Sequence, residues 1–175
     1  MPPTPILHLL CGRIASGKST LAAKLAARDG AVLLAEDAWL AALYGDQLTE
    51  VEDFVRFSAR IRVVVGPLVL SVLGRGVSVV LDFQANTVAS RRWMMELVRS
   101  SGAAHRLHLL DVPSEVCLAR LQARNARGVH PFAVTAEQFA RMNRHFALPT
   151  ADEGFVILRH ANPAGRGADT ISGGS

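Results

Sequence analysis

The stretch GRIASGKS at residues 12–19 decides the fold of this chain. It fits the pattern G-x-x-x-x-G-K-[ST], whose glycines let successive backbone N–H groups turn inward around phosphate oxygens. An apolar run, Ile6–Cys11, precedes it and is typical of a buried strand, and residues 19–28 are typical of a helix. A helix N-terminus favours an anion, because its first N–H groups lack partners and its dipole is positive there. The sequence therefore predicts a loop that binds the phosphates of a nucleotide.

The residue types within this loop suggest individual roles. Lys18 is expected to reach the β- and γ-phosphates, and the Ser19 hydroxyl is expected to bind Mg²⁺. The nucleotide-binding residues expected from the loop are Gly12, Ala15, Ser16, Gly17, Lys18, Ser19 and Thr20. Common GTPases select guanine with the motif Asn-Lys-x-Asp, but the only lysines of this chain are Lys18 and Lys24. ATP is therefore the expected nucleotide.

Apolar runs and amphipathic stretches alternate along the rest of the chain. Further strands are predicted at 31–35, 77–81, 106–112 and 155–158, and helices at 37–44, 50–73, 87–100, 114–126 and 135–146. Pro67 is expected to kink or split the longest helix. Continuous apolar strands separated by helices indicate a parallel sheet that is buried on both faces. We therefore predict an α/β three-layer sandwich, with a five-stranded parallel sheet, helices on both faces and a small helical lid at about residues 120–134.

Length, charge and composition limit the classes of function. The 175 residues predict a single domain, over 1–164, followed by a Gly- and Ser-rich tail at 165–175 that we expect to be disordered. The net charge of +4 suits an anionic ligand, but no aromatic residues interleave with a basic stripe, so nucleic acid is not favoured. The most apolar stretch, 63–73, falls short of the ~20 residues of a membrane span. Without a signal-peptide pattern, we expect a cytoplasmic protein.

Two carboxylates follow predicted strands at the edge of the sheet where ligands bind in such folds. Asp82, after Val79-Val80-Leu81, can hold Mg²⁺ directly or through water, or it is simply a loop or cap residue. Asp37 can face the γ-phosphate and accept a proton from an attacking hydroxyl, or it caps the following helix. Glu36 is the less favoured base, because its side chain is expected to point the other way.

Arginines supply the expected positive charge for the transferred group. Arg120, Arg124 and Arg127 lie at helical spacing and precede the predicted lid loop, so they can close over the phosphates; the alternative is a solvated basic face. Arg13, inside the phosphate loop, is expected to be exposed near phosphate or substrate. Arg91, next to Arg92, is expected to form a surface pair that could also reach a substrate.

The stretch 38–73, between the second and third predicted strands, is wide and apolar, and we expect it to form the pocket of an acceptor molecule. Trp39 within this stretch either packs in the core or walls that pocket.

The phosphate loop, Ala-Glu-Asp37, Val-Val-Leu-Asp82 and the arginine helix resemble small P-loop kinases of the polynucleotide kinase, zeta toxin and chloramphenicol phosphotransferase type. The resemblance implies that Asp37 is the general base and that Arg120 and Arg124 stabilise the phosphoryl group. Ala38-Trp39-Leu40 lacks the arginine that polynucleotide kinases carry there, which disfavours a nucleic-acid substrate. Phe83-Gln84-Ala85 stands where shikimate kinases have a glycine-rich triplet.

The function predicted from these patterns is transfer of the γ-phosphoryl group of ATP, with Mg²⁺, to a hydroxyl of a small molecule. Lys18, Asp37, Arg120 and Arg124 are the predicted catalytic residues. Arg127 joins Arg120 and Arg124 in the nucleotide-binding set, and Ser19 and Asp82 form the metal site. Two alternatives stay open: a toxin-like kinase of nucleic acids or nucleotide sugars, and an ATPase or switch module that acts on a protein partner.

Overall fold

The computed structural model describes residues 4–128 and 133–160. Its strands are β1 (Ile6–Gly12), β2 (Val32–Ala35), β3 (Val79–Gln84), β4 (Ala104–Leu110) and β5 (Ile157–His160). Its helices are α1 (Lys18–Asp29), α2 (Glu36–Tyr44), α3 (Val51–Leu73), α4 (Val88–Ser101), α5 (Ser114–Arg127) and α6 (Ala136–Arg144), with the 3-10 turns η1 (Gly45–Gln47) and η2 (Ala151–Glu153). The predicted tail and part of the predicted lid, at 129–132, lie outside the described residues.

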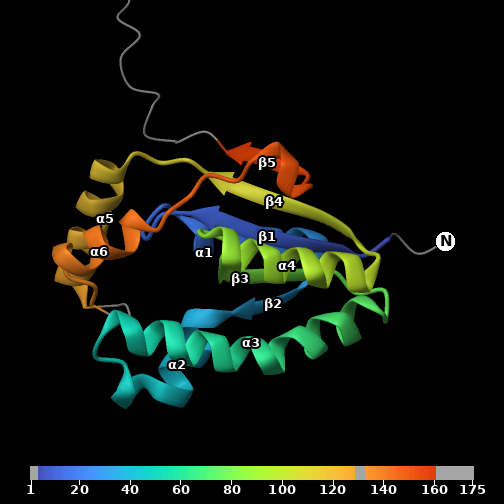
Figure 1. Cartoon of the computed structure of the whole chain (residues 1–175), viewed down its shortest axis with the longest axis horizontal. Coiled ribbons are helices and arrows are strands. Elements are labelled where there is room, and N and C mark those ends of the chain that lie inside the picture. The colour runs from blue at the N-terminus through green and yellow to red at the C-terminus, as the bar shows by residue number, and fades with distance from the viewer. Residues whose placement is uncertain (1–3, 129–132, 161–175) are drawn as a thin grey trace, which may run out of the picture.

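The described strands form one sheet in the order β2-β3-β1-β4-β5, and every neighbouring pair is parallel. The predicted five-stranded parallel sheet is therefore confirmed. β1 lies at the centre between β3 and β4, and Leu7, Leu9 and Leu10 along it are completely buried. The carboxyl ends of the strands all open at the same edge of the sheet, beside α5 and α6 (Figure 1).

Helices cover both faces of the sheet, as predicted. On one face, Leu10 and Val80 pack against Ala22 and Leu25 of α1. On the other face, the main core packs the opposite side chains of the central strands against α3 and α4 (Figure 1). Successive strand residues point to opposite faces, so the continuous apolar runs supply side chains for both layers.

The long helix α3 runs through Pro67 without a break, so the expected alternative of a split is wrong, and the kink stays a prediction. It begins with a capping box, in which Glu50 and Asp53 each accept a backbone N–H at the helix start. Pro67 lies on the exposed outer side, while Val65 and Val69 on the inner side are completely buried. The carbonyl of Val63 that loses its bond to a proline therefore faces the solvent side, and apolar packing of the inner side holds the helix together.

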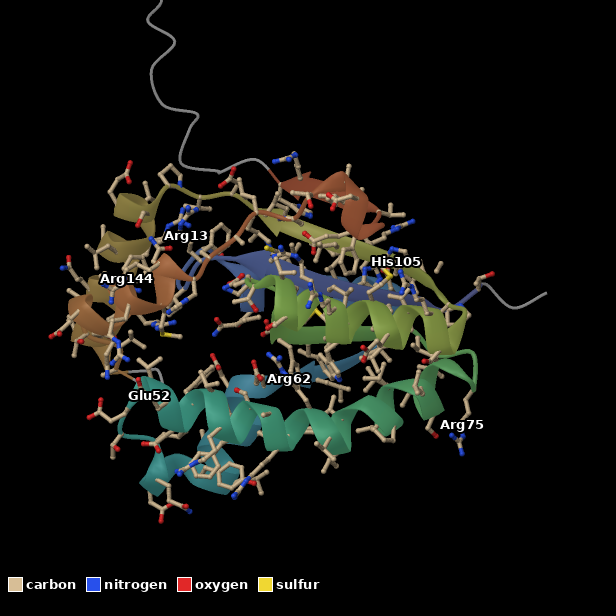
Figure 2. The ribbon with its side chains drawn as sticks, viewed as in Figure 1. Arg13, Glu52, Arg62, Arg75, His105 and Arg144 are labelled. Atoms are coloured by element: carbon tan, nitrogen blue, oxygen red, sulfur yellow. The ribbon has the colours of Figure 1, made fainter. Side chains whose placement is uncertain are left out.

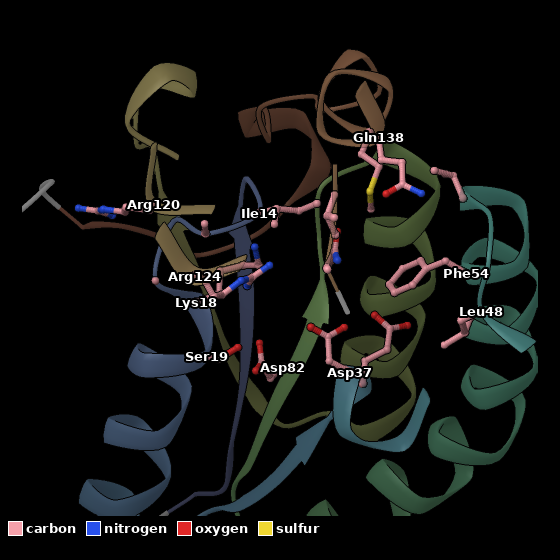
Figure 3. A pocket seen from close by; sticks show the side chains of 18 of the residues that line it. Ile14, Lys18, Ser19, Asp37, Leu48, Phe54, Asp82, Arg120, Arg124 and Gln138 are labelled. Atoms are coloured by element: carbon pink, nitrogen blue, oxygen red, sulfur yellow. The ribbon is translucent and has the colours of Figure 1, made fainter. Parts of the chain in front are cut away.

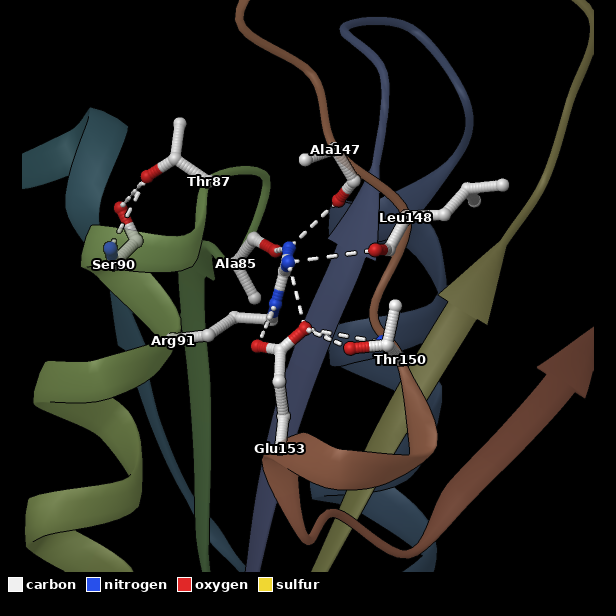
Figure 4. A network of polar contacts seen from close by, with 8 residues as sticks. All are labelled: Ala85, Thr87, Ser90, Arg91, Ala147, Leu148, Thr150 and Glu153. Carbon is white, nitrogen blue, oxygen red and sulfur yellow. Dashed lines mark hydrogen bonds and ion pairs between the residues drawn. The ribbon is translucent and has the colours of Figure 1, made fainter.

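Arg91 is not a surface residue, which corrects the prediction. Its side chain is completely buried and donates to Glu153 over 2.6 and 2.9 Å, to the carbonyl of Ala85 over 3.0 Å and to the carbonyl of Ala147 over 2.7 Å (Figure 4). Arg92 is exposed, as expected. The buried pair ties α4 to the segment between α6 and β5, so it supports the end of the sheet at which the phosphate loop lies.

A chain of imidazoles crosses the face of the sheet that α1 covers. His8 of β1 contacts Asp29 over 3.1 Å and His108 of β4 over 2.9 Å, and His108 contacts His160 of β5 over 2.9 Å. Burial lowers the pKa of His108 to about 4, and the neighbouring His8 and His160 also act against its charge. The chain is therefore neutral near pH 7, with each ring able to donate one N–H to the next acceptor.

Candidate active site

The phosphate loop has the backbone geometry of an anion cradle. Ala15 and Gly17 have positive φ angles of 62° and 101°, which turn the chain sharply between β1 and α1. Within the loop, Ser16 donates its N–H to the carbonyl of Arg13 over 3.1 Å, and in α1 the N–H of Leu21 bonds to the carbonyl of Gly17 over 3.1 Å. The N–H groups ahead of it at the start of α1 have no intrahelical acceptor and are available to an anion.

Gly12 and Lys18 brace this loop. A Cβ at Gly12 would lie 2.6 Å from the Ser16 hydroxyl and 2.9 Å from the carbonyl of Leu110, so the position has no room for a side chain. The ammonium of Lys18 donates to the carbonyls of Gly12 and Arg13 over 2.6 and 2.8 Å. These carbonyls hold the lysine at the mouth of the loop, where it can exchange them for phosphate oxygens.

Asn86 is a supporting residue that the sequence patterns did not reveal. Its side-chain oxygen accepts the N–H of Gly12 over 2.9 Å, and its carbonyl accepts the N–H of Ala147 over 2.9 Å. Asn86 follows β3, the strand beside β1, and the only signal available in the sequence was its position just past the end of that strand. It joins the start of the phosphate loop to the segment that Arg91 anchors.

Ser19 and Asp82 come together as the predicted metal site requires. The Ser19 hydroxyl faces the Asp82 carboxylate, and this hydrogen bond partly offsets the burial that raises the pKa of Asp82 (Figure 3). No cluster of three or more His, Cys, Asp or Glu side chains suited to a metal occurs among the described residues. A hydroxyl and one carboxylate fit Mg²⁺, which keeps several waters and takes its remaining ligands from phosphates.

Asp37 lies in the first turn of α2, and the cap residue of that helix is Ala35. Its charge acts on three groups of the phosphate site. It favours the charged forms of Lys18 and Arg124, whose pKa values burial lowers, and it raises the pKa of Asp82. Asp37 therefore stands opposite the phosphate loop, within electrostatic reach of the groups expected around the γ-phosphate (Figure 3).

Glu36 also faces the site, contrary to the expectation that it would point away. Its carboxylate is 1% exposed and lies 3.9 Å from the guanidinium of Arg62. Burial raises its pKa, while Arg62 and Ser58 act in the opposite direction. The strand ends at Ala35 and the helix starts at Glu36, so the alternation of a strand no longer separates Glu36 from Asp37.

The three arginines of α5 differ in their positions. Arg124 is half-buried and lines the cavity at the phosphate loop, and Figure 3 shows it directed toward Lys18. Arg120 lines the same cavity but is directed away from Asp37 in that view. Arg127 is exposed and does not line the cavity. Its predicted contact with the nucleotide stays a prediction.

A cavity of about 550 Å³ brings most of the predicted residues together (Figure 3). From the predicted set it is lined by Ala15, Gly17, Lys18, Ser19, Thr20, Asp37, Asp82, Arg120 and Arg124. Its far wall comes from Leu48, Phe54 and, on α6, Gln138, none of which belongs to a phosphate-binding motif. Gly12 and Ser16 support the loop from within, and both are buried.

The structure also bears on the predictions for Arg13 and Trp39. Arg13 is not an exposed phosphate contact: its guanidinium donates to Asn143 over 2.9 Å and lies 4.3 Å from the centre of the Phe146 ring. It therefore links the phosphate loop to α6. Trp39 packs against the main core and lines neither the phosphate cavity nor the second cavity, which lies between α3, α4 and α6, in agreement with the core alternative.

The helices within the described residues include none with the length and apolar character needed to cross a membrane.

Comparisons with known proteins agree with this architecture. A candidate kinase from Chloroflexus aurantiacus is 22% identical, with a TM-score of 0.71 over 90% of this chain and 88% of that one. A sugar kinase from Janibacter is 19% identical, with a TM-score of 0.63 over 90% and 86%. Chaetomium thermophilum Kti12, solved with ADP-AlF3, is 14% identical, with a TM-score of 0.64 over 89% of each chain. These likenesses show the fold of P-loop kinases.

Sequence comparisons place the chain more narrowly. None of the curated proteins matches its sequence significantly. The model of the AAA_33 family, described as an AAA domain, matches residues 7–149, which span the phosphate loop, both site carboxylates and the arginines of α5. The chain belongs to the AAA_33 family.

Proposed function

We propose that this protein is an ATP- and Mg²⁺-dependent phosphotransferase that moves the γ-phosphoryl group to a hydroxyl of a small molecule. The observation that carries the proposal is the placement of Asp37. Its carboxylate shares one cavity with Lys18 and Arg124, opposite the phosphate loop. A nucleotide-binding loop alone needs no carboxylate there, whereas transfer to a hydroxyl needs a base at that position.

The residues of the chain divide the chemistry as follows. The N–H groups at the start of α1 and the ammonium of Lys18 bind the phosphates. Ser19 and Asp82 would hold Mg²⁺, which neutralises phosphate charge when it is bound. Asp37 accepts the proton of the acceptor hydroxyl, and the oxygen of that hydroxyl forms a bond to the γ-phosphorus. The bond to the bridging oxygen breaks and ADP leaves, with Lys18 and Arg124 offsetting the charge.

Asp37 suits the role of base better than Glu36. Asp37 is half-buried and interacts with the charges around the phosphates, whereas Glu36 is almost completely buried and its pKa is raised by burial. A base must reach the attacking hydroxyl at the γ-phosphate, directly or through one water. The lining residues place Asp37 in the phosphate cavity and leave Glu36 at its border with a second cavity.

The decisive experiment measures transfer of label from γ-labelled ATP to a panel of hydroxylated metabolites, antibiotics and 5′-hydroxyl oligonucleotides. Wild type is compared with Asp37→Asn and with Asp46→Asn, a matched control on the exposed turn η1. We expect label on a small-molecule acceptor, a loss of about 10²-fold or more in Asp37→Asn, and no change in the control. Release of free phosphate alone, unaffected by Asp37→Asn, would instead favour an ATPase or switch. Label on the oligonucleotides alone would favour a nucleic-acid kinase.

A further inference from the structure

A second cavity, of about 690 Å³, lies between α3, α4 and α6 and adjoins the phosphate cavity. The residues that line both cavities are Ile14, Glu36, Val51, Phe54, Gln84 and Met142. Its volume falls within the range of sites for small organic ligands. A molecule seated in the second cavity could therefore project one group across this shared border toward Asp37.

Polar side chains at the inner end of this cavity are buried, and their contacts with one another do not have the geometry of ordinary hydrogen bonds. Glu36 and Ser58 are 1% and 5% exposed. Both carboxylate oxygens of Glu36, the Ser58 hydroxyl and Nε of Arg62 are buried, and none has a hydrogen bond of ordinary length among the described residues. Such groups are rare inside proteins, because an unmade hydrogen bond to a buried group costs free energy. Their position in a cavity indicates that a bound molecule completes them.

The donors and acceptors of this cluster define what that molecule must offer. The Glu36 carboxylate only accepts, so the ligand must bring an O–H or N–H group. Arg62 already donates to Ser90 over 3.3 Å and stacks over the ring of Trp93 at 5.2 Å, so its Nε–H is left for one ligand oxygen. Figure 2 shows Arg62 directed from α3 toward α4. A hydroxyl can both donate to Glu36 and accept from Arg62.

The remaining wall and the charge balance define the rest of the ligand. Much of the wall is apolar, including Phe54, Val55, Trp93, Phe139, Met142 and Phe146. The two guanidiniums that line the cavity each face a carboxylate: Arg62 lies 3.9 Å from Glu36, and Arg13 lies 3.5 Å from Asp111. Little positive charge is left over for a phosphorylated or polyanionic ligand, and a polyhydroxylated sugar would lose many hydrogen bonds against this wall.

We propose that this cavity is the acceptor site and that Glu36, Ser58 and Arg62 select an uncharged amphiphilic alcohol with an apolar body. One polar group of the acceptor is held by the cluster, its ring or chain packs between α3, α4 and α6, and its reacting hydroxyl reaches Asp37. This assignment rests on the proposed phosphotransferase function, and it names the substrate class of the same site.

Trp93 provides a readout that does not depend on phosphoryl transfer. The chain has two tryptophans, and Trp93 lines the second cavity whereas Trp39 packs in the core. The indole N–H signal of Trp93 in NMR spectra, assigned with Trp39→Phe, is followed as styrene glycol, a neutral aryl diol, is added with an imido analogue of ATP. Glucose and a 5′-hydroxyl oligonucleotide are the comparison ligands.

We expect a saturable shift of the Trp93 signal with styrene glycol and a weaker response to the comparison ligands. Glu36→Gln should weaken binding of styrene glycol about tenfold or more, because a charge-assisted hydrogen bond is lost. Ser58→Ala should weaken it severalfold with little effect on the fold, because the Ser58 hydroxyl makes no hydrogen bond of ordinary geometry within the described residues. Glu96→Gln, an exposed position on α4, is the matched control.

Either of two results would overturn the assignment: no saturable response of Trp93 to styrene glycol, or a response unchanged in both Glu36→Gln and Ser58→Ala. Tighter binding of glucose or of the oligonucleotide would overturn the substrate class. The results that contradict the proposed function differ from the results that contradict the cavity assignment. Binding of styrene glycol with no transfer to any hydroxyl leaves the cavity assignment intact, whereas transfer to glucose without a Trp93 response supports a kinase and refutes the assignment.

Discussion

Replacing Arg91 by Met should destabilise this protein by a large part of its total stability. The change keeps most of the aliphatic stem but deletes the guanidinium, which is completely buried. Glu153 then loses two hydrogen bonds, of 2.6 and 2.9 Å, and the carbonyls of Ala85 and Ala147 lose their bonds of 3.0 and 2.7 Å (Figure 4).

The size of the effect follows from what is left unpaired. Removing one partner of a buried ion pair costs about 3–5 kcal/mol. The lower part of that range applies to the carboxylate, because Glu153 is 16% exposed and keeps a hydrogen bond of 3.0 Å from the N–H of Thr150. The two orphaned carbonyls add about 1 kcal/mol or more. The expected loss is therefore about 4 kcal/mol, against a typical total of about 5–15 kcal/mol.

The assay is urea unfolding followed by circular dichroism and tryptophan fluorescence. With a slope of about 2 kcal/mol per molar urea, the midpoint should fall by about 2 M. Arg92→Met, an exposed neighbour on the same helix, is the control and should change stability by less than about 0.5 kcal/mol. In the Arg91→Met background, Glu153→Gln should cost at least about 1 kcal/mol less than in the wild type.

A loss below about 1 kcal/mol for Arg91→Met, or additive effects of the two substitutions, would refute the reasoning. The first result would mean that water reaches the carbonyls and the carboxylate once the guanidinium is removed. The second would mean that the two side chains do not act as a pair. Equal slopes in all variants are needed for either conclusion, because a changed slope would indicate altered compactness and not altered stability.

Three further predictions concern the loop, the sheet and α5. Gly12→Ala places a Cβ 2.9 Å from the carbonyl of Leu110, so ATP should bind about tenfold or more weakly in calorimetry; unchanged affinity would show that the loop adjusts. Because the folded state lowers the pKa of His108 to about 4, it binds fewer protons than the unfolded state between about pH 4 and the ordinary value of 6.5. The free energy of unfolding should therefore fall, by at most about 3 kcal/mol, as the pH drops through that window, and His108→Gln should flatten this slope in urea titrations. Arg124→Ala should lower kcat by about 10²-fold and the exposed Arg127→Ala by much less, so equal losses would contradict the placement of α5.

The fold and the phosphate loop were predicted from patterns of residues that lie close together in the sequence. The loop motif, the apolar run before it and the helix after it are contiguous, so their geometry follows from local backbone preferences. The helix caps were equally local. Thr87 accepts the N–H of Ser90, and Thr135 and Gln138 form a capping box. Asp82 was expected just after a strand and lies inside the carboxyl-terminal half of β3, beside β1, which still brings it to Ser19 because neighbouring parallel strands end at one edge.

The local sequence rules gave wrong expectations at the start of α2 and at Pro67 within α3. Glu36 was assigned to the wrong side because the rule of alternating strand faces was extended one residue past the end of β2. The split expected at Pro67 did not occur because packing of the inner side of α3 outweighs one missing hydrogen bond. In both cases a local preference gave way to the position of the residue in the assembled layers.

By itself, the sequence determined the nucleotide loop, the parallel sheet and the sheet edge at which the site lies, because each depends on residues close together in the chain. The tertiary structure alone decided the partners of the charged side chains. Arg91 meets Glu153 across 62 positions and Arg13 meets Asn143 across 130, distances over which no periodicity carries information. The second cavity and its buried cluster of Glu36, Ser58 and Arg62 likewise exist only once α2, α3 and α4 are packed. Pairing in a folded interior depends on where helices converge in space, and that is a property of the whole packed chain.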